Sequence, residues 1–361
     1  MQIRLPQLDA VRGIAILLVI LHNESTKYPA LRLENIFASG WMGVDLFFVL
    51  SGLLITGILL DTKDTEGYLR NFYARRCLRI WPLYFSLLFF MFVVAPFVRP
   101  SVGAEIFERS SPWWSYLLFL QNFLVPNSTG AAGPLGVTWS LAIEEQFYLI
   151  WPFIVCYLSS AHLTRIAVTV FCVSPALRLF LSFYSVDLYS NVFCRLDGLM
   201  AGALIALMMR SRSFVPSKFV KPAWIAFFIS LPIALLTDSD ETRWVVFSWS
   251  AVASASLVYL SLYSEQGWLQ RLMKNRFLMY TGTISYGLYL LHKIPFDVAE
   301  TIGLDRYPFV AAPLMLVACY VTAVMSWHLL EKPFLRFKRV FESRPVAQVE
   351  TGEMAVAGLP R

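Results

Sequence analysis

The sequence predicts an all-α fold: a polytopic integral membrane bundle of about ten transmembrane helices plus one short interfacial or re-entrant helix. Of its 361 residues, 57% are hydrophobic and only 15% are charged, which leaves too little polar surface to cover a soluble globule of this size. Apolar runs recur along the whole chain, and about twenty such residues suffice for a helix to cross a bilayer. Neither strand-like alternation nor an internal repeat interrupts these runs.

Ten segments qualify as spans, because each is an apolar run bounded by polar or charged residues. They lie at residues 8–22, 40–60, 80–99, 139–158, 165–184, 195–209, 221–237, 244–263, 281–299 and 308–330. The run 113–125 is too short to cross and lies in a polar loop, so we expect an interfacial or re-entrant helix there. We expect residues 1–338 to form one transmembrane domain and residues 339–361 a disordered cytoplasmic tail.

The positive charges predict an orientation. Most of the 30 Lys and Arg residues fall in the amino terminus, the even-numbered loops and the tail, which places both termini in the cytoplasm because cytoplasmic loops carry the excess of positive charge. The formal charge of +6 is spread in short clusters between apolar runs. Anionic lipid headgroups and anionic cofactors are therefore the expected partners, and nucleic acid is not.

Ionisable side chains within or beside the spans are the candidate functional residues, because such groups are rare at membrane depth. On the cytoplasmic side, Arg12 begins the first span, and Arg70, Arg75, Arg76 and Arg79 precede the third. Arg76 and Arg79 are three residues apart, so they share a helix face and can grip one anion together. The positive-inside rule explains Arg70 and Arg75 equally well.

A second group of polar residues lies toward the outer ends of the spans. It comprises His22, Asp45, Glu144, Glu145, Gln146, Arg195, Asp197 and His292. We expect these groups to face one another or a watery cavity. A structural ion pair is the alternative for Arg195 and Asp197, and a satisfied structural histidine near Tyr289 is the alternative for His292.

Seven segments carry a family resemblance. LDAVRGIAILLVILH, GVDLFFVLSGLLI, YARRCLRIWPLYF, TWSLAIEEQFYLIWP, RLDGLMAGALIA, ISYGLYLLH and EKPFLRF occur in this order and resemble the membrane acyltransferase-3 family of bacterial O-acyltransferases. The resemblance covers residues 5–338. It implies transfer of an acyl group, acetyl ahead of succinyl, from cytoplasmic acyl-CoA to a hydroxyl of a surface glycan, exopolysaccharide or lipid-linked saccharide.

The resemblance also implies a bacterial inner-membrane location, no metal, and a stand-alone membrane module, since the chain has no room for the SGNH-type esterase domain of some members. In that family an Arg and a His on the first span and an R-x-x-R motif before the third are functional. Here these positions are Arg12, His22, Arg76 and Arg79.

Acyl transfer from a thioester to a hydroxyl needs a base, a hold on the donor and groups that stabilise the oxyanion. His22 suits the base, and a carboxylate can orient its ring; the candidates are Asp45, Glu144 and Glu145. The expected donor-binding residues are Arg12, Arg75, Arg76 and Arg79, and the expected acceptor-side residues are Gln146, Arg195, Asp197 and His292. A transporter or flippase of an anionic substrate is the alternative, although paired repeats are absent.

The first span departs from the family pattern. Nine residues separate Arg12 from His22, where the family pattern usually has ten. In a regular α-helix ten steps leave the two side chains about 80° apart around the axis. We therefore predict a tightening or a break between Leu18 and Asn23 that turns His22 back toward the polar interior.

Overall fold

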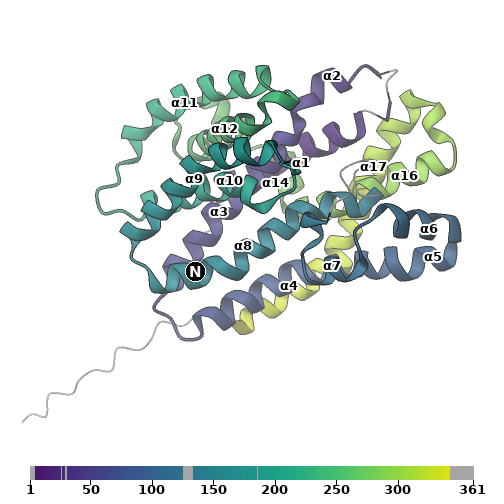
Figure 1. Ribbon diagram of the computed structural model, residues 1–361, viewed down its shortest axis with the longest axis horizontal. Helices are drawn as coiled ribbons and strands as arrows, with labels where there is room; N and C mark the ends of the chain where they lie inside the picture. Colours follow the sequence, from purple (N-terminus) through teal and green to yellow (C-terminus); the bar gives the residue numbers. More distant parts are fainter. Residues whose placement is uncertain (1–4, 26, 29–30, 125–132, 185, 342–361) are drawn as a thin grey trace, which may run out of the picture.

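The computed structural model describes residues 5–25, 27–28, 31–124, 133–184 and 186–341. Within these ranges the regular elements are helices and no strand is present (Figure 1). The all-α prediction is therefore confirmed.

Long helices form the body of the molecule, because the apolar runs that predict spans fold as continuous α-helices at most positions. They are α1 (Pro6–Ser25), α3 (Met42–Thr62), α4 (Tyr68–Phe89), α8 (Thr138–Tyr157), α9 (Ser160–Ser182), α10 (Val192–Met209), α11 (Pro216–Leu236), α12 (Arg243–Tyr263) and α17 (Pro308–Ser326).

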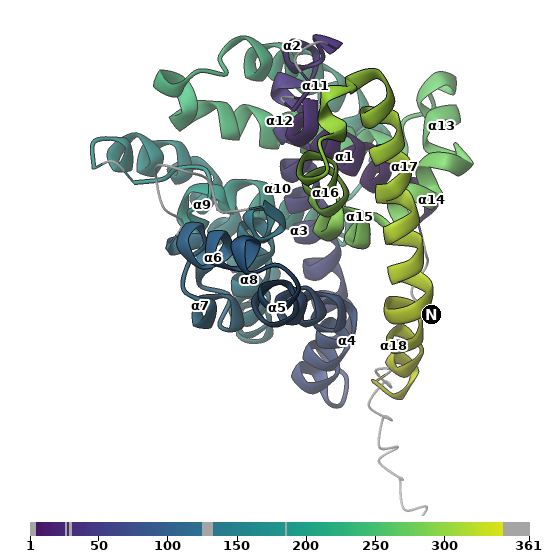
Figure 2. The ribbon, with the colours of Figure 1, turned by 90° about the vertical axis from the view of Figure 1, so that its right-hand side faces the viewer.

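Shorter elements connect or extend them. The α-helices are α2 (Glu34–Phe37), α5 (Ala95–Val98), α6 (Pro100–Arg109), α7 (Trp113–Leu117), α13 (Gly267–Met273), α14 (Arg276–Thr283), α15 (Ser285–Leu291), α16 (Lys293–Thr301) and α18 (Lys332–Arg336). Two π-helical turns, η3 (Phe90–Val94) and η8 (Trp327–Glu331), extend α4 and α17. The 3₁₀ turns are η2 (Ala38–Trp41), η4 (Gln121–Phe123), η5 (Gly133–Val137), η6 (Asp240–Thr242), η7 (Leu304–Arg306) and η9 (Phe337–Phe341). Figure 2 shows α17 and α18 following one another along one side of the molecule.

Seven helical segments in the described part of the chain are long and apolar enough to cross a membrane, judged by length and composition. They are Ala38–Thr62, Tyr68–Val98, Ser160–Ser182, Val192–Met209, Pro216–Leu236, Arg243–Tyr263 and Pro308–Phe341. Helices α1 and α8, at the predicted spans 8–22 and 139–158, have similar lengths but fall outside this set. The predicted count of about ten is therefore not confirmed.

The predicted span 281–299 is wrong as one continuous helix. The chain there is divided among α14, α15 and α16, with Ile284 and His292 between them. Pro295 lies in the first turn of α16 and has no N–H to donate to the carbonyl of Leu291, so it removes a hydrogen bond that a continuous helix would need. The high apolarity of the segment conceals this division.

Two further expectations concern short segments. The run 113–125 contains only the brief α7 and η4 among its described residues, which agrees with a helix too short to cross; its place at an interface stays a prediction. The polar stretch before it is not simply a loop, because it includes α6. Of the predicted tail 339–361, residues 339–341 belong to η9, and the rest lies outside the described residues.

Close backbone contacts hold α1 at the centre of the bundle, where it packs against α3, α14 and α15. A Cβ atom added at Gly282 would lie 1.7 Å from the carbonyl oxygen of Asp9, so only glycine allows α14 to approach α1 this closely. The chain then reverses at Ile284, and α15 also packs on α1. This packing brings α15 beside the helix that carries Arg12.

Candidate active site

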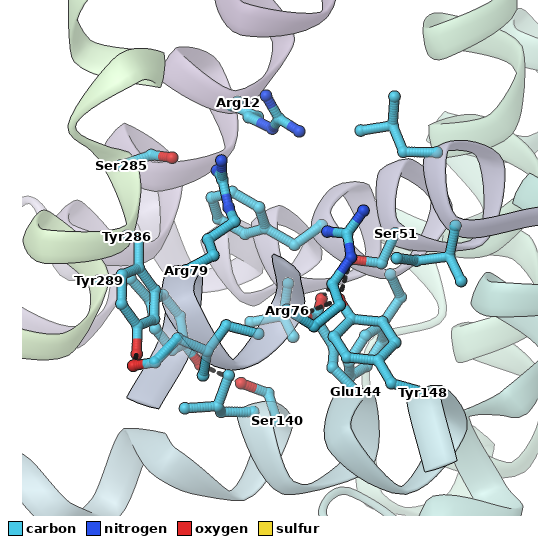
Figure 3. A pocket seen from close by; sticks show the side chains of 17 residues that line it. Arg12, Ser51, Arg76, Arg79, Ser140, Glu144, Tyr148, Ser285, Tyr286 and Tyr289 are labelled. Carbon is cyan, nitrogen blue, oxygen red and sulfur yellow. Dashed lines mark hydrogen bonds between the residues drawn. The ribbon is translucent and has the colours of Figure 1, made fainter. Parts of the chain in front are cut away.

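A cavity of about 110 Å³ lies where α1, α3, α4, α8 and α15 meet (Figure 3). Its apolar walls come mainly from α3, and its polar groups come from all five helices. The polar lining residues are Arg12, Ser51, Arg76, Arg79, Ser140, Glu144, Tyr148, Ser285, Tyr286 and Tyr289. The cavity therefore joins segments that are far apart in the sequence.

Arginines dominate the charge of this cavity. Arg76 and Arg79 lie on one face of α4, as their spacing predicts, and Arg12 faces the same space from α1 (Figure 3). Arg12 donates from Nη1 to Oδ1 of Asp9 at 2.9 Å. Neither Arg76 nor Arg79 forms an ion pair with any residue that the structure describes, which leaves both guanidinium groups available to an anion.

Aromatic rings hold Arg76 in place. Its guanidinium carbon lies 5.7 Å from the ring centroids of both Phe72 and Tyr148, a distance typical of cation–π contacts. Arg75 does not line the cavity, and Arg70 lies over the ring of Phe341 at 6.0 Å. The structure thus separates the two inward arginines of α4 from their neighbours on the same helix.

One carboxylate, that of Glu144, lines the cavity among the described residues. Its two oxygens accept hydrogen bonds from hydroxyl groups: Ser51 Oγ at 2.6 Å and Tyr148 Oη at 3.0 Å. Because hydroxyls satisfy Glu144, it is not tied to an arginine. The cavity keeps an excess of positive charge, which attracts anionic ligands. Sequence reasoning missed Tyr148, which lies four residues after Glu144 on the same helix face.

The predicted tightening or break in the first span is wrong, because α1 continues as an α-helix to Ser25. His22 does not line the cavity. Its Nδ1 lies 3.0 Å from the carbonyl oxygen of Phe37, and its Cβ packs beside Gly40. A carbonyl oxygen can only accept, so Nδ1 is the donor in this hydrogen bond. The hydrogen-bond partner of the His22 ring at Nδ1 is thus a carbonyl, where a carboxylate was expected.

Asp45 and Arg195 form an ion pair with each other. Arg195 Nη2 donates to Asp45 Oδ1 at 2.5 Å, and its guanidinium carbon lies 4.0 Å from the ring centroid of Phe247. Both side chains are buried, and neither lines the cavity. The predicted alternative of a structural ion pair applies here, with Asp45 as the partner.

Asp197 pairs with a different arginine, so the alternative of an ion pair applies to Asp197 as well, with Arg178 and not Arg195 as the partner. Arg178 Nη1 donates to Asp197 Oδ2 at 2.9 Å, and Arg178 Nε donates to the carbonyl of Trp244 at 2.8 Å. Arg178 is fully buried. Sequence reasoning gave Arg178 no role, although an arginine in the middle of an apolar span is itself a sign of a buried partner.

Gln146 and Glu145, the two residues after Glu144, do not line the cavity. Gln146 Nε2 donates to the carbonyl of Phe119 at 2.7 Å and to Oδ1 of Asn122 at 2.8 Å, which ties α8 to the segment that includes η4. Glu145 does not line the cavity, and its buried Oε1 has no hydrogen-bond partner in the described ranges. Of the three adjacent residues, only Glu144 therefore belongs to the cavity.

His292 is fully buried between α15 and α16. Its Nδ1 lies 2.8 Å from the carbonyl oxygen of Tyr289, as the alternative of a structural histidine near Tyr289 predicts. Its Nε2, however, has no hydrogen-bond partner among the described residues, so the ring is not fully satisfied. His292 does not line the cavity, whereas Tyr289 does. Within the described residues, no three His, Cys, Asp or Glu side chains converge as a metal site.

Comparisons with known proteins identify the family. A family model described as an acyltransferase domain matches residues 5–328. A peptidoglycan O-acetyltransferase of Listeria monocytogenes is 27% identical over 354 residues, covering 91% of this chain and 55% of that protein. A putative O-acetyltransferase of Staphylococcus aureus is 28% identical, covering 91% and 57%, and a putative peptidoglycan O-acetyltransferase of Bacillus subtilis is 31% identical, covering 91% and 54%.

The chain thus spans a little over half the length of these curated relatives. No solved structure matches it. The apolar helices and these relatives together mark a multi-pass membrane protein. Because the family model matches most of the chain, the protein belongs to the acyltransferase-3 family.

Proposed function

We propose that this protein is an integral-membrane O-acyltransferase that uses acyl-CoA. It moves an acyl group, acetyl ahead of succinyl, from cytoplasmic acyl-CoA to a hydroxyl of a surface glycan, exopolysaccharide or lipid-linked saccharide. The observation that carries the proposal is the cavity, in which Arg76 and Arg79 face Arg12 without an ion-pair partner of their own among the described residues. The O-acetyltransferase names of the relatives support the reaction type.

The arginines supply the hold on the donor. Guanidinium groups form short, charge-assisted hydrogen bonds to phosphate, often two at a time, so Arg76 and Arg79 suit the phosphates of CoA. Arg12 lies beside the guanidinium ends of both residues (Figure 3). The pantetheine arm then carries the thioester inward past Ser51 and Tyr148. Each of these hydroxyls donates its single proton to Glu144, so it must turn from Glu144 to donate to the carbonyl oxygen as negative charge develops there.

The transfer itself makes one bond and breaks another. The hydroxyl oxygen of the acceptor attacks the thioester carbon, the C–O bond forms and the C–S bond breaks. The hydroxyl proton passes to a base, and the CoA thiolate leaves and is protonated to the free thiol. Two histidines near the outer end of α1 are candidates for the base: His22, which the family resemblance implies, and His292.

Orientation follows the distribution of positive charge. We place both termini on the cytoplasmic side of a bacterial inner membrane, which puts Arg12, Arg76 and Arg79 on the side where CoA is available. Membrane lipids cover the apolar faces of α9, α11 and α17, whose most apolar windows are only 22%, 11% and 22% buried. The acceptor approaches from the opposite side, so CoA never has to cross.

The test uses purified protein in detergent or liposomes with acetyl-CoA. We expect a CoA-dependent rise in thermal stability and release of free CoA that an added glycan acceptor accelerates. Absence of both a thermal shift and CoA release would overturn the proposal and favour the transporter or flippase. Mass spectrometry of surface glycans from cells with and without the gene then identifies the acceptor, because the added mass separates acetyl from succinyl.

A further inference from the structure

A buried acid and a buried histidine face each other beyond the cavity. Glu24 lies in the last turn of α1 and His292 lies between α15 and α16. Their side chains are 4% and 0% exposed, and Nε2 of His292 is 3.9 Å from Oε1 of Glu24. Neither group takes part in the cavity described above. Sequence reasoning missed Glu24, although it is a carboxylate at the outer end of the first span.

Three polar atoms at this contact lack hydrogen bonds. Both carboxylate oxygens of Glu24 and Nε2 of His292 are buried without a partner in the described part of the chain. Because Nδ1 of His292 donates to the carbonyl of Tyr289 at 2.8 Å, Nε2 holds the ring's lone pair. Buried polar atoms are rarely left unsatisfied. A hydroxyl placed about 2.8 Å from Nε2 can donate its single proton to that lone pair, and the carboxylate of Glu24 is then positioned beside the proton that Nε2 receives.

A graded series of charged side chains connects this pair to the surface. Lys27 Nζ lies 3.7 Å from Glu24, 2.6 Å from Asp297 and 3.8 Å from Glu300. Exposure of the side chains falls from 67% at Glu300 through 35% at Asp297 and 27% at Lys27 to the buried pair. Desolvation lowers the pKa of Lys27, but Glu24 and Asp297 outweigh it and raise that pKa above its ordinary value. This polar path suits hydroxyl-rich ligands.

On its other side, His292 adjoins the arginine cavity. Tyr289 lines the cavity, and its ring centroid is 6.3 Å from that of His292. His292 therefore lies between the cavity assigned to the donor and the polar path from the surface. His22 lies two residues before Glu24, which turns it about 160° away around the helix, and its Nδ1 contacts Phe37 instead.

We propose that His292 is the catalytic base for the acceptor and that Glu24 is its carboxylate partner. The inference rests on the acyltransferase function proposed above. A carbohydrate hydroxyl enters along Lys27 and Asp297, and Nε2 of His292 takes its proton as the oxygen bonds to the acyl carbon and the C–S bond breaks. The proton then goes to the CoA thiolate, and the carboxylate of Glu24 stabilises the imidazolium in between.

The test compares His292→Ala, His292→Asn and Glu24→Gln with the wild type, using release of CoA from acetyl-CoA in the presence of a glycan acceptor. His292→Asn is the folding-matched variant, because its amide nitrogen stands where Nδ1 does and can still donate to the carbonyl of Tyr289. We expect kcat to fall roughly 100-fold or more in both His292 variants and about 10-fold in Glu24→Gln, with the KM for acetyl-CoA within about two-fold. His162→Ala, at an exposed histidine of α9, is the control.

Imidazole separates a lost base from a lost structure. We expect added imidazole to restore turnover to His292→Ala and to give no such rescue in His22→Ala. Turnover in His292→Ala within a few-fold of the wild type would overturn the inference, as would a loss that imidazole does not restore or a rescue at His22 instead. In each of these results the wild type still releases CoA, so the acyltransferase proposal stands. A wild type that releases no CoA overturns both.

Discussion

Two pairs of arginines in the long helices of this protein differ in what surrounds them. Arg178 and Arg195 are each paired with an aspartate and fully buried, and neither lines the cavity. Arg76 and Arg79 face the cavity and have no ion-pair partner within the described ranges. All four stand in long helices of an apolar chain. An arginine in a membrane helix can therefore have a structural role or a binding role. Whether an acidic partner lies beside it distinguishes the two roles better than its depth in the span does.

The physical reason is desolvation. Removing a charge from water is costly, and a paired and enclosed arginine recovers that cost only from its partner. An arginine at an open cavity keeps some water and can exchange it for a ligand anion. Replacing residues in the paired group should therefore lower the stability of the protein, whereas replacing the cavity arginines should weaken ligand binding. Both expectations can be tested by experiment.

The largest expected effect is on stability, in the paired group. Asp45→Ala leaves the guanidinium of Arg195 buried without its counter-charge, and we expect a loss of about 3–5 kcal/mol, measured by thermal unfolding in detergent. A double variant, Asp45→Leu with Arg195→Met, should regain most of this loss because no charge remains buried. Weakened CoA binding at unchanged stability would instead indicate that Asp45 and Arg195 belong to the CoA-binding site.

The next effect is on ligand affinity, in the cavity group. Arg76→Ala and Arg79→Ala should each weaken CoA binding by about 10-fold or more, since hydrogen bonds to charged groups contribute about 1.5–3 kcal/mol. The loss should shrink at high salt, and Lys should restore only part of it. Binding by calorimetry is the measurement, and Arg70→Ala on the same helix, with the same change in charge, is the control. Unchanged affinity for CoA in these variants would mean that Arg76 and Arg79 only set the orientation of the protein in the membrane.

The smallest expected effect is a gain in CoA affinity, opposite in sign to the effect of removing the arginines. Glu144→Gln removes the negative charge from the cavity lining while its amide oxygen can still accept from Ser51 or Tyr148. We expect CoA to bind a few-fold more tightly, because the remaining field is more positive. Weaker binding in this variant would mean that Glu144 contacts the donor or holds the arginines in position.

Local periodicity predicted part of the site. The three-residue spacing of Arg76 and Arg79 placed both on one face of α4, and both line the cavity. In a regular helix Arg12 and His22 point in different directions around the axis. The α1 helix is regular, and His22 accordingly does not line the cavity that Arg12 lines. The predicted distortion was wrong because a contact with Phe37 and Gly40 satisfies His22 where it stands.

The apolar composition of a segment did not show whether it folds as one continuous helix. The stretch 281–299 has the apolarity of a span, yet it is divided into short helices, because a hydropathy count does not register the missing N–H of Pro295. The contact that requires Gly282 is equally invisible without the neighbouring helix, since it depends on the carbonyl of Asp9.

Composition, the order of the motifs and the helical period are enough to predict the all-α membrane architecture, the family and the inward arginines of α4. The pairing of charges, in contrast, depends on how the helices pack. Asp45 meets Arg195 and Ser51 meets Glu144 across long stretches of chain, and Glu24 faces His292. These partners stand on helices whose adjacency depends on packing between distant segments, which no local pattern records.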